Sequence, residues 1–359
     1  MSGKHYTRAL VMSVAAAATL LLIGSATLPS GAASTASAVA KRPAVRRNGL
    51  TLAIGGHRAH IAARPTKLGH ADMLNGPLVY KGGPVMQSGV TNTIILWNPG
   101  HLQNGATTGY SAKYSSLAMR WFADQPASPL YANLNQYYQL IGGKGSFIQR
   151  DNKAPKLFRD TRKFPTGQCT NPDTGVNCIT DANLVAEVRH FVVANNLPSG
   201  LKYEYFVLTP NGEGSCFDST CQYPSYTRYC AYHSYAPRAA GSTSEIIYAD
   251  MPYPTDPGGH NCYYAPGTYS QTSPSGDVEA DANINLMSHE QYESVTDPLI
   301  NAWTDSTGSE IGDVCAWQFG DVFPSGGDLQ INGHPYDTQS EGDNHNLALG
   351  GTGCVFAGP

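Results

Sequence analysis

Eight cysteines, all in the second half of the chain or close to it, limit how this protein can fold: Cys169, Cys178, Cys216, Cys221, Cys230, Cys262, Cys315 and Cys354. In an exported chain, an even number of cysteines most simply indicates disulfides, because oxidising compartments let such bonds persist. Zinc binding by cysteine is the alternative, but the chain contains no C-x-x-C pair. We expect Cys169 to pair with Cys178 and Cys315 with Cys354, because both pairs stand apart from the remaining four cysteines.

Export itself is predicted by residues 1–40, which resemble a signal peptide. Lys4 and Arg8 precede an apolar stretch over residues 9–24, and Ala38-Val39-Ala40 matches the small-x-small pattern after which signal peptidase cleaves. Cleavage after Ala33 or Ala38 fits as well. An uncleaved membrane anchor is the alternative, but the apolar stretch is shorter than the roughly 20 residues of a spanning helix. We therefore expect a secreted, extracellular protein with no stable membrane insertion after cleavage.

The charge of the chain changes sign beyond this segment. Seven basic residues and no acidic one lie between Lys41 and Lys67, whereas from Met73 onward 14 Lys and Arg stand against 26 Asp and Glu. Residues 41–76 are accordingly predicted to be a basic linker or a pro-segment that masks an active site, and the linker is the simpler interpretation. An acidic body has the wrong sign for phosphate, so we expect no nucleic-acid partner.

The body, residues 77–359, has the length of one domain or of two lobes around a cleft. Apolar and β-branched runs predict strands, and apolar residues at helical spacing, bounded by Gly and Pro, predict helices. The strands are expected at Thr93–Trp97, Tyr203–Leu208 and Glu245–Ala249, and the helices at Ser111–Asp124, at Asp181–Asn195 behind a Thr180 cap, and at Asp277–Thr296. This order predicts an α+β fold with a mixed sheet and loops stabilised by disulfides.

The last of these helices carries the pattern that most suggests chemistry. His289 and Glu293 lie four residues apart and therefore on one face, where both can reach one ion, and Glu290 lies beside them. This is the layout of a zinc-peptidase helix, in which two ligands at i and i+4 hold the metal and the intervening Glu accepts a proton from water. Glu293 replaces the usual second histidine. A carboxylate ligand is compatible with zinc but also admits calcium or manganese.

A third ligand is expected from the block that follows the helix. Glu310 is the first choice and Asp313 the second, and Cys315 can anchor this block. Asp297, at the helix end, is more simply a capping group or a group that orients a ligand. The alternative for the whole set is a structural polar cluster on an ordinary helix.

His233 is a further candidate, as a metal ligand or a substrate-binding residue, although a buried histidine held by hydrogen bonds is the simpler interpretation. The chain contains no G-x-S-x-G elbow and no G-x-x-x-x-G-K-[ST] loop, so nothing indicates a serine hydrolase or a nucleotide-binding enzyme.

Several motifs together resemble the EXORDIUM / phosphate-induced protein family. They are Gly82-Gly83-Pro84-Val85 before Ile94-Ile95-Leu96-Trp97, Phe206-Val207-Leu208-Thr209, Cys230-Ala231-Tyr232-His233, His289-Glu290-x-x-Glu293 with Pro298-Leu299-x-Asn301-Ala302-Trp303, and Glu310-Ile311-Gly312-Asp313-x-Cys315. They span most of the body from about residue 80. The basic leader and most of the Tyr-rich region 223–264 have no counterpart.

The resemblance implies a secreted protein, of the kind that plant members represent in the cell wall and apoplast. It adds weight to the block from His289 to Asp313 but names no substrate. Plant relatives commonly carry Asn at the position of Asp297, which argues against Asp297 as an obligatory ligand.

The leading hypothesis is a secreted, zincin-like metal-dependent hydrolase, most simply a peptidase, acting on an extracellular peptide or cell-wall substrate. One divalent ion, zinc before calcium or manganese, is held by His289, Glu293 and Glu310 or Asp313, and Glu290 is the general base. The strand at Glu245–Ala249 could pair with an extended substrate. The alternatives are a non-enzymatic extracellular module that binds cell-wall carbohydrate or a signalling partner, and a zincin scaffold that has lost catalysis.

Overall fold

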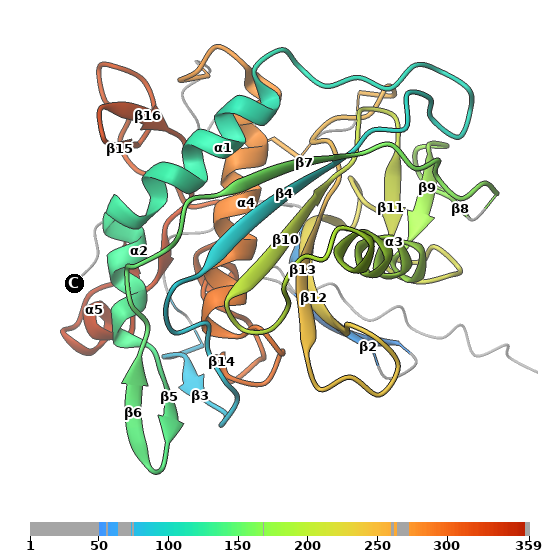
Figure 1. The fold of residues 1–359 in the computed structure, drawn as a ribbon. Helices are drawn as coiled ribbons and strands as arrows, with labels where there is room; N and C mark the ends of the chain where they lie inside the picture. Colours follow the sequence, from blue (N-terminus) through green and yellow to red (C-terminus); the bar gives the residue numbers. More distant parts are fainter. Residues whose placement is uncertain are drawn as a thin grey trace, which may run out of the picture. The chain divides into compact units, whose positions relative to one another are not determined.

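A seven-stranded mixed sheet forms the centre of the fold in the computed structural model (Figure 1). The structure describes residues 50–54, 57–63, 73, 75–167, 169–259, 262–263 and 273–355, so the predicted signal peptide lies outside the described residues. The strands of the sheet, in spatial order, are β1 (Leu50–Ile54), β2 (His57–Ala63), β12 (Tyr229–Pro237), β13 (Glu245–Met251), β10 (Tyr203–Leu208), β4 (Thr91–Trp97) and β7 (Lys156–Asp160).

Helices and shorter strands surround this sheet. The helices are α1 (Tyr114–Asp124), α2 (Pro129–Asn133), α3 (Asp181–Ala194), α4 (Val278–Thr296) and α5 (Asn344–Ala348), with 3-10 turns η1 (Gln125–Ala127), η2 (Leu134–Gln136) and η3 (Asp313–Cys315). The short strands pair as β5 (Tyr138–Ile141) with β6 (Lys144–Phe147), β14 (Trp303–Thr304) with β3 (Val79–Tyr80), β15 (Leu329–Ile331) with β16 (His334–Tyr336), β17 (Glu341–Gly342) with β18 (Cys354–Val355), and β11 (Gly214–Cys216) with β9 (Asn177–Thr180) and β8 (Cys169–Thr170). The predicted α+β class and mixed sheet are confirmed.

The strand pairing changes from parallel to antiparallel across the sheet. Strands β13, β10, β4 and β7 run parallel, and all seven residues of β4 are buried, as expected for a parallel strand covered on both faces. Strands β12, β2 and β1 continue the sheet in antiparallel pairs. Because β13 pairs with β10 on one side and β12 on the other, the predicted addition of a substrate strand at Glu245–Ala249 is wrong.

The hairpin of β1 and β2 lies inside the basic segment 41–76. Its second strand pairs with the outer edge of β12, in a register that places Ile61 opposite Tyr232 and Ala59 opposite Ser234. Part of this segment is therefore a component of the sheet, and its removal as a pro-segment stays a prediction.

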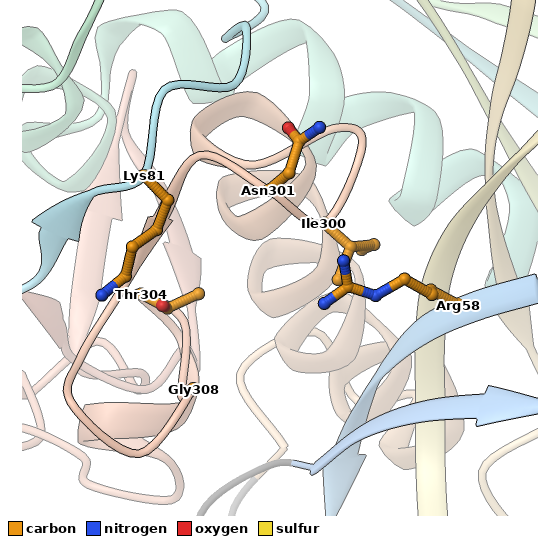
Figure 2. A pocket seen from close by; sticks show the side chains of 6 residues that line it. All are labelled: Arg58, Lys81, Ile300, Asn301, Thr304 and Gly308. Carbon is orange, nitrogen blue, oxygen red and sulfur yellow. The ribbon is translucent and has the colours of Figure 1, made fainter.

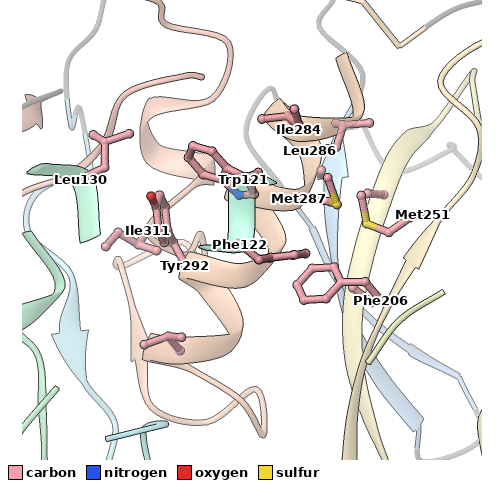
Figure 3. Packing of buried hydrophobic residues seen from close by; sticks show 14 of the residues in the cluster. Trp121, Phe122, Leu130, Phe206, Met251, Ile284, Leu286, Met287, Tyr292 and Ile311 are labelled. Atoms are coloured by element: carbon pink, nitrogen blue, oxygen red, sulfur yellow. The ribbon is translucent and has the colours of Figure 1, made fainter. Parts of the chain in front are cut away.

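Two apolar clusters cover the two faces of the sheet. Helices α1 and α4 pack on one face, where Phe122 of α1 lies 4.6 Å from Phe206 of β10 between ring centroids (Figure 3). Helix α3 packs on the opposite face, with Leu184 and Val188 in a second cluster. Successive residues of a strand point to opposite faces, so neighbouring residues of β12 face different helices.

The three predicted helices and three predicted strands are all present. Thr180 caps α3 as expected, and its hydroxyl accepts a hydrogen bond from the backbone of Asn183. Asp277 caps α4 by accepting from the backbone of Ala280, and α4 ends two residues before Pro298.

The cysteines form four disulfides: Cys169–Cys178, Cys216–Cys221, Cys230–Cys262 and Cys315–Cys354. Both expected pairs are confirmed. All eight sulfurs are therefore used in covalent bonds, which removes cysteine thiolates as metal ligands. Among the described helices, none combines the length and apolar composition needed to span a bilayer.

Candidate metal centre

The candidate centre lies where α4 packs against β12. Every residue of α4 from Ala280 to Thr296 is buried, so the polar side chains of this helix lie inside the protein together with the apolar ones. His289 is 2% exposed and Glu290 and Glu293 are fully buried, as is His233 on β12. The structure thus brings the predicted helix motif and the separately predicted His233 together.

One group of possible ligands contains His289, Glu293 and Asp313. Nε2 of His289 lies 3.1 Å from Oε1 of Glu293 and 3.7 Å from Oδ1 of Asp313. One donor atom from each of the three residues lies within 4.8 Å of the other two. The predicted i, i+4 pair and the second-choice downstream acid therefore converge.

A second group contains His233, Glu293 and Glu310, with the same mutual separation of at most 4.8 Å. Nδ1 of His233 lies 3.5 Å from Oε2 of Glu293, and its Nε2 lies 3.8 Å from Oε2 of Glu310. Nδ1 also lies 3.4 Å from Oε2 of Glu290. The first-choice downstream acid is therefore close to His233, and His233 lies among the candidate ligands.

We call the six side chains His233, His289, Glu290, Glu293, Glu310 and Asp313 the α4-face cluster. The loop that carries its last two members is held tightly against α4. The backbone of Asp313 donates to Oε1 of Glu293 at 3.2 Å, and the backbone of Glu310 donates to Oδ2 of Asp313 at 3.1 Å. The Cys315–Cys354 disulfide follows directly, as the predicted anchoring role requires.

Gly312 makes this close approach possible. A Cβ atom at this position would lie 2.7 Å from Nδ1 of His289 and 3.0 Å from Oε1 of Glu293, which is closer than van der Waals contact allows. The absence of a Cβ atom at this residue thus lets the loop carrying Glu310 and Asp313 reach the helix.

Two neighbours of the cluster have no signal in the sequence. Nε2 of Gln339 lies 3.0 Å from Nδ1 of His289 and donates to the carbonyl of Gly312 at 2.8 Å, which fixes the imidazole with Nε2 towards the carboxylates. Glu341 is fully buried, and burial together with the nearby charges of Glu293 and Asp313 raises its pKa well above the usual value.

Asp297 has the capping role that the sequence suggests. Its Oδ1 accepts hydrogen bonds from the backbone of Asn301 at 2.5 Å and of Ala302 at 2.6 Å, which closes the turn after α4. Burial raises its pKa, although these hydrogen bonds act in the opposite direction. Its carbonyl oxygen lies 3.4 Å from Nε2 of His233, so this turn borders the cluster.

A surface pocket of about 340 Å³ lies on the outer side of the same turn (Figure 2). Arg58 of β2 and the residues Lys81, Ile300, Asn301, Thr304 and Gly308 line it. Ile300 is 2% exposed and has a φ of 52°, a left-handed conformation that a β-branched residue rarely adopts. Ile300 of this turn thus lines the pocket, and Asp297 of the same turn borders His233.

The donor set fits a divalent cation. The buried residues of the described chain include no Lys or Arg, so no buried side chain with a permanent positive charge balances the four carboxylates of the cluster. Burying several carboxylates without a counter-charge is costly, and such groups in proteins are paired, protonated or bound to metal. Imidazole nitrogen together with carboxylate oxygen suits zinc and manganese.

Comparison of this chain with protein-family models, curated proteins and solved structures finds no match. The resemblance to the EXORDIUM / phosphate-induced family therefore stays a prediction from the motifs.

Proposed function

We propose that this protein is a secreted metal-dependent hydrolase with a zincin-like arrangement, most simply a peptidase acting on extracellular peptide or cell-wall material. The observation that carries the proposal is the position of the Glu293 carboxylate, 3.1 Å from His289 and 3.5 Å from His233, with a further acid beside each imidazole. The same side chains that the zinc-peptidase pattern singles out lie together with a histidine from β12 and with acids from the loop after β14, which supports the proposal.

Glu290 is the proposed general base. It shares the helix with the two α4 ligands and lies 3.4 Å from His233, so it borders the ion site. A divalent ion held there would polarise the scissile carbonyl and make water a stronger acid. A buried carboxylate next to this site can accept the proton of the attacking water and return it to the leaving group. The pocket beside the Asp297–Ile300 turn is the proposed approach for the substrate.

Glu290→Gln tests this assignment, because the amide keeps the size of the side chain and cannot accept the proton. We expect unchanged metal content, measured by elemental analysis of the purified protein, and a loss of peptide hydrolysis of about 100- to 10,000-fold. Asp250→Asn on the opposite face of the sheet is the matched control and should keep full activity. Unchanged turnover in Glu290→Gln would eliminate Glu290 as the base.

A non-enzymatic extracellular module is the second candidate, and the burial of the cluster favours it. All six side chains are at most 2% exposed, which is typical of structural ion sites, whereas a catalytic site needs an open coordination position. Under this alternative the cation holds α4, β12 and the downstream loop together. Binding on a glycan array without turnover of any peptide substrate, combined with tightly bound calcium, would support the module over the hydrolase.

A further inference from the structure

The two oxygens of Glu293 face different imidazoles. Oε1 lies 3.1 Å from Nε2 of His289, whereas Oε2 lies 3.5 Å from Nδ1 of His233. A carboxylate that directs one oxygen to each of two histidines has the geometry with which a glutamate bridges a pair of ions. Glu293 is also the one residue common to both groups of donors in the described part of the chain.

Each imidazole also has an acid of its own. Asp313 approaches His289 to 3.7 Å, and Glu310 approaches His233 to 3.8 Å. Two ligands of one ion, each about 2.1 Å from it at tetrahedral angles, lie about 3.4 Å apart. In the first group both separations, 3.1 and 3.7 Å, start from Nε2 of His289 and match that distance. In the second group Glu293 lies 3.5 Å from Nδ1 of His233 and Glu310 lies 3.8 Å from its Nε2, and one donor atom of each residue lies within 4.8 Å of the other two.

Charge gives a second argument. Four carboxylates, those of Glu290, Glu293, Glu310 and Asp313, lie within this buried cluster, and no buried Lys or Arg accompanies them in the described chain. One divalent ion balances two of the four negative charges. Two divalent ions balance all four, and burial raises the pKa values of Asp297 and Glu341, the two further acids beside the cluster.

We propose that the centre holds two divalent ions, one at His289, Glu293 and Asp313 and the other at His233, Glu293 and Glu310, with Glu293 bridging them. The proposal rests on the metal-dependent function proposed above and replaces its single ion with a pair. Two-ion hydrolytic centres have ions about 3.5–4 Å apart, a spacing that one bridging carboxylate can span. Mixed imidazole and carboxylate donors suit zinc or manganese at both positions.

Metal counting on the full secreted chain tests the proposal. After removal of all ions and reconstitution with Zn²⁺, we expect two equivalents per chain in the wild type. Glu310→Gln and Asp313→Asn should each retain one equivalent, because each removes the acid that belongs to one ion only. Asp250→Asn, a buried acid on the other face of the sheet, should retain two and shows that loss of a buried carboxylate alone does not change the count.

A measurement on the wild type alone guards against variants that misfold. Reconstitution of the wild type with Mn²⁺ should give an electron paramagnetic resonance spectrum of two coupled ions. One equivalent of metal with an uncoupled spectrum in the wild type would overturn the second site. Metal-dependent, Glu290-dependent hydrolysis in that case would leave the proposed function standing, whereas hydrolysis that survives complete metal removal would eliminate the function itself.

Discussion

Neighbouring residues of β12 meet buried acids on opposite faces of the sheet, and the two faces neutralise those acids differently. Tyr232 faces α3, where its hydroxyl donates to Oδ1 of Asp181 at 2.9 Å and the hydroxyl of Tyr248 donates to the same atom at 2.7 Å. His233 faces α4, where it meets carboxylates of Glu290, Glu293 and Glu310. We call Asp181, Tyr229, Tyr232, Tyr248 and Asp250 the α3-face cluster.

The α3-face cluster contains its own donors. Asp181 lies in the first turn of α3, where the helix dipole also favours a negative charge. On the α4 face, acids lie beside acids, and burial together with the charges of Glu293 and Asp313 raises the pKa of the neighbouring Glu341. Equal burial therefore has different consequences. Hydroxyl donors stabilise Asp181 within the protein, and Asp250 of the same cluster keeps a proton because burial raises its pKa to about 8. The crowded carboxylates of the α4 face require protons or a cation from outside.

Metal removal should have the largest effect on stability, and this effect should come from the α4 face alone. If the free ion is about 100,000 times more concentrated than its Kd, binding contributes about 7 kcal/mol to the free energy of unfolding. We therefore expect chelation to lower the thermal midpoint of the wild type substantially and to leave that of Glu293→Gln nearly unchanged, measured by calorimetry. Equal midpoints of the wild type with and without chelator would show that the α4 face needs no cation.

The next largest effect concerns Asp250. Burial raises the pKa of this carboxyl group to about 8. In the unfolded chain this group ionises near pH 4. Between pH 4 and pH 8 its titration therefore lowers the stability of the wild type by about 1.4 kcal/mol per pH unit, or by about 4 kcal/mol from pH 5 to pH 8. Asp250→Asn lacks this titration.

Urea denaturation at pH 5 and at pH 8 checks the expectation. The stability of Asp250→Asn relative to the wild type should rise by about that amount between the two pH values, because all other titrating groups are common to both proteins. A difference that is constant with pH would mean that Asp250 is ionised in the folded protein throughout this range.

Asp181→Ala should have the third largest effect. It takes the common acceptor from two buried tyrosine hydroxyls, and an unsatisfied buried hydroxyl costs about 1–3 kcal/mol, so we expect a loss of about 3 kcal/mol in the free energy of unfolding. Tyr232→Phe removes one donor and should cost about 1 kcal/mol. Both variants should bind metal as the wild type does, and any change in their metal content would contradict the separation of the two faces.

With the exception of one disulfide, the sequence predicts the parts of the fold and of the site that depend on residues close together in the chain, and it does not predict those that depend on residues far apart. Helices α3 and α4 and their caps follow from patterns within about 20 residues, and so does the i, i+4 placement of His289 and Glu293. The isolated spacing of Cys315 and Cys354 sufficed to predict their disulfide. The helices and the i, i+4 pair depend on residues close in the chain, whereas the disulfide joins residues 39 apart and follows from the distance of this pair from the other cysteines.

The rest of the site depends on sheet order. His233 joins the cluster because β12 lies under α4, and no local pattern determines which strand takes that position. Gln339 and Glu341 lie in a segment with no helical or strand periodicity, and it reaches the helix through contacts such as the bond from Gln339 to Asn285 across 54 residues. For the same reason no local pattern predicts that β2 pairs with β12.

The smallest expected effect is that of Gly312→Ala, a variant that tests how closely the downstream loop must approach α4. In Gly312→Ala the new methyl group would lie 2.7 Å from His289 and 3.0 Å from Glu293, so the loop or the imidazole must move by several tenths of an ångström. Misplacing a ligand or the group that orients it typically lowers metal affinity 10- to 100-fold, about 1.4–2.7 kcal/mol. The backbone of Gly312 has a φ of −73°, which alanine adopts freely, so the effect comes from the lost space alone.

Gly109→Ala is the matched control, because a Cβ atom there meets nothing within 4 Å. Competition with a chromogenic chelator measures the affinity of both variants, and urea denaturation of the metal-free proteins measures the cost of the methyl group itself. Because Gly312 touches only the α4 face, the α3-face cluster should be unaffected, and Asp250 should titrate in Gly312→Ala as it does in the wild type. Unchanged affinity in Gly312→Ala would mean that Glu310 and Asp313 do not need the close loop that this glycine permits, and would leave His289 and Glu293 to hold the cation with other partners.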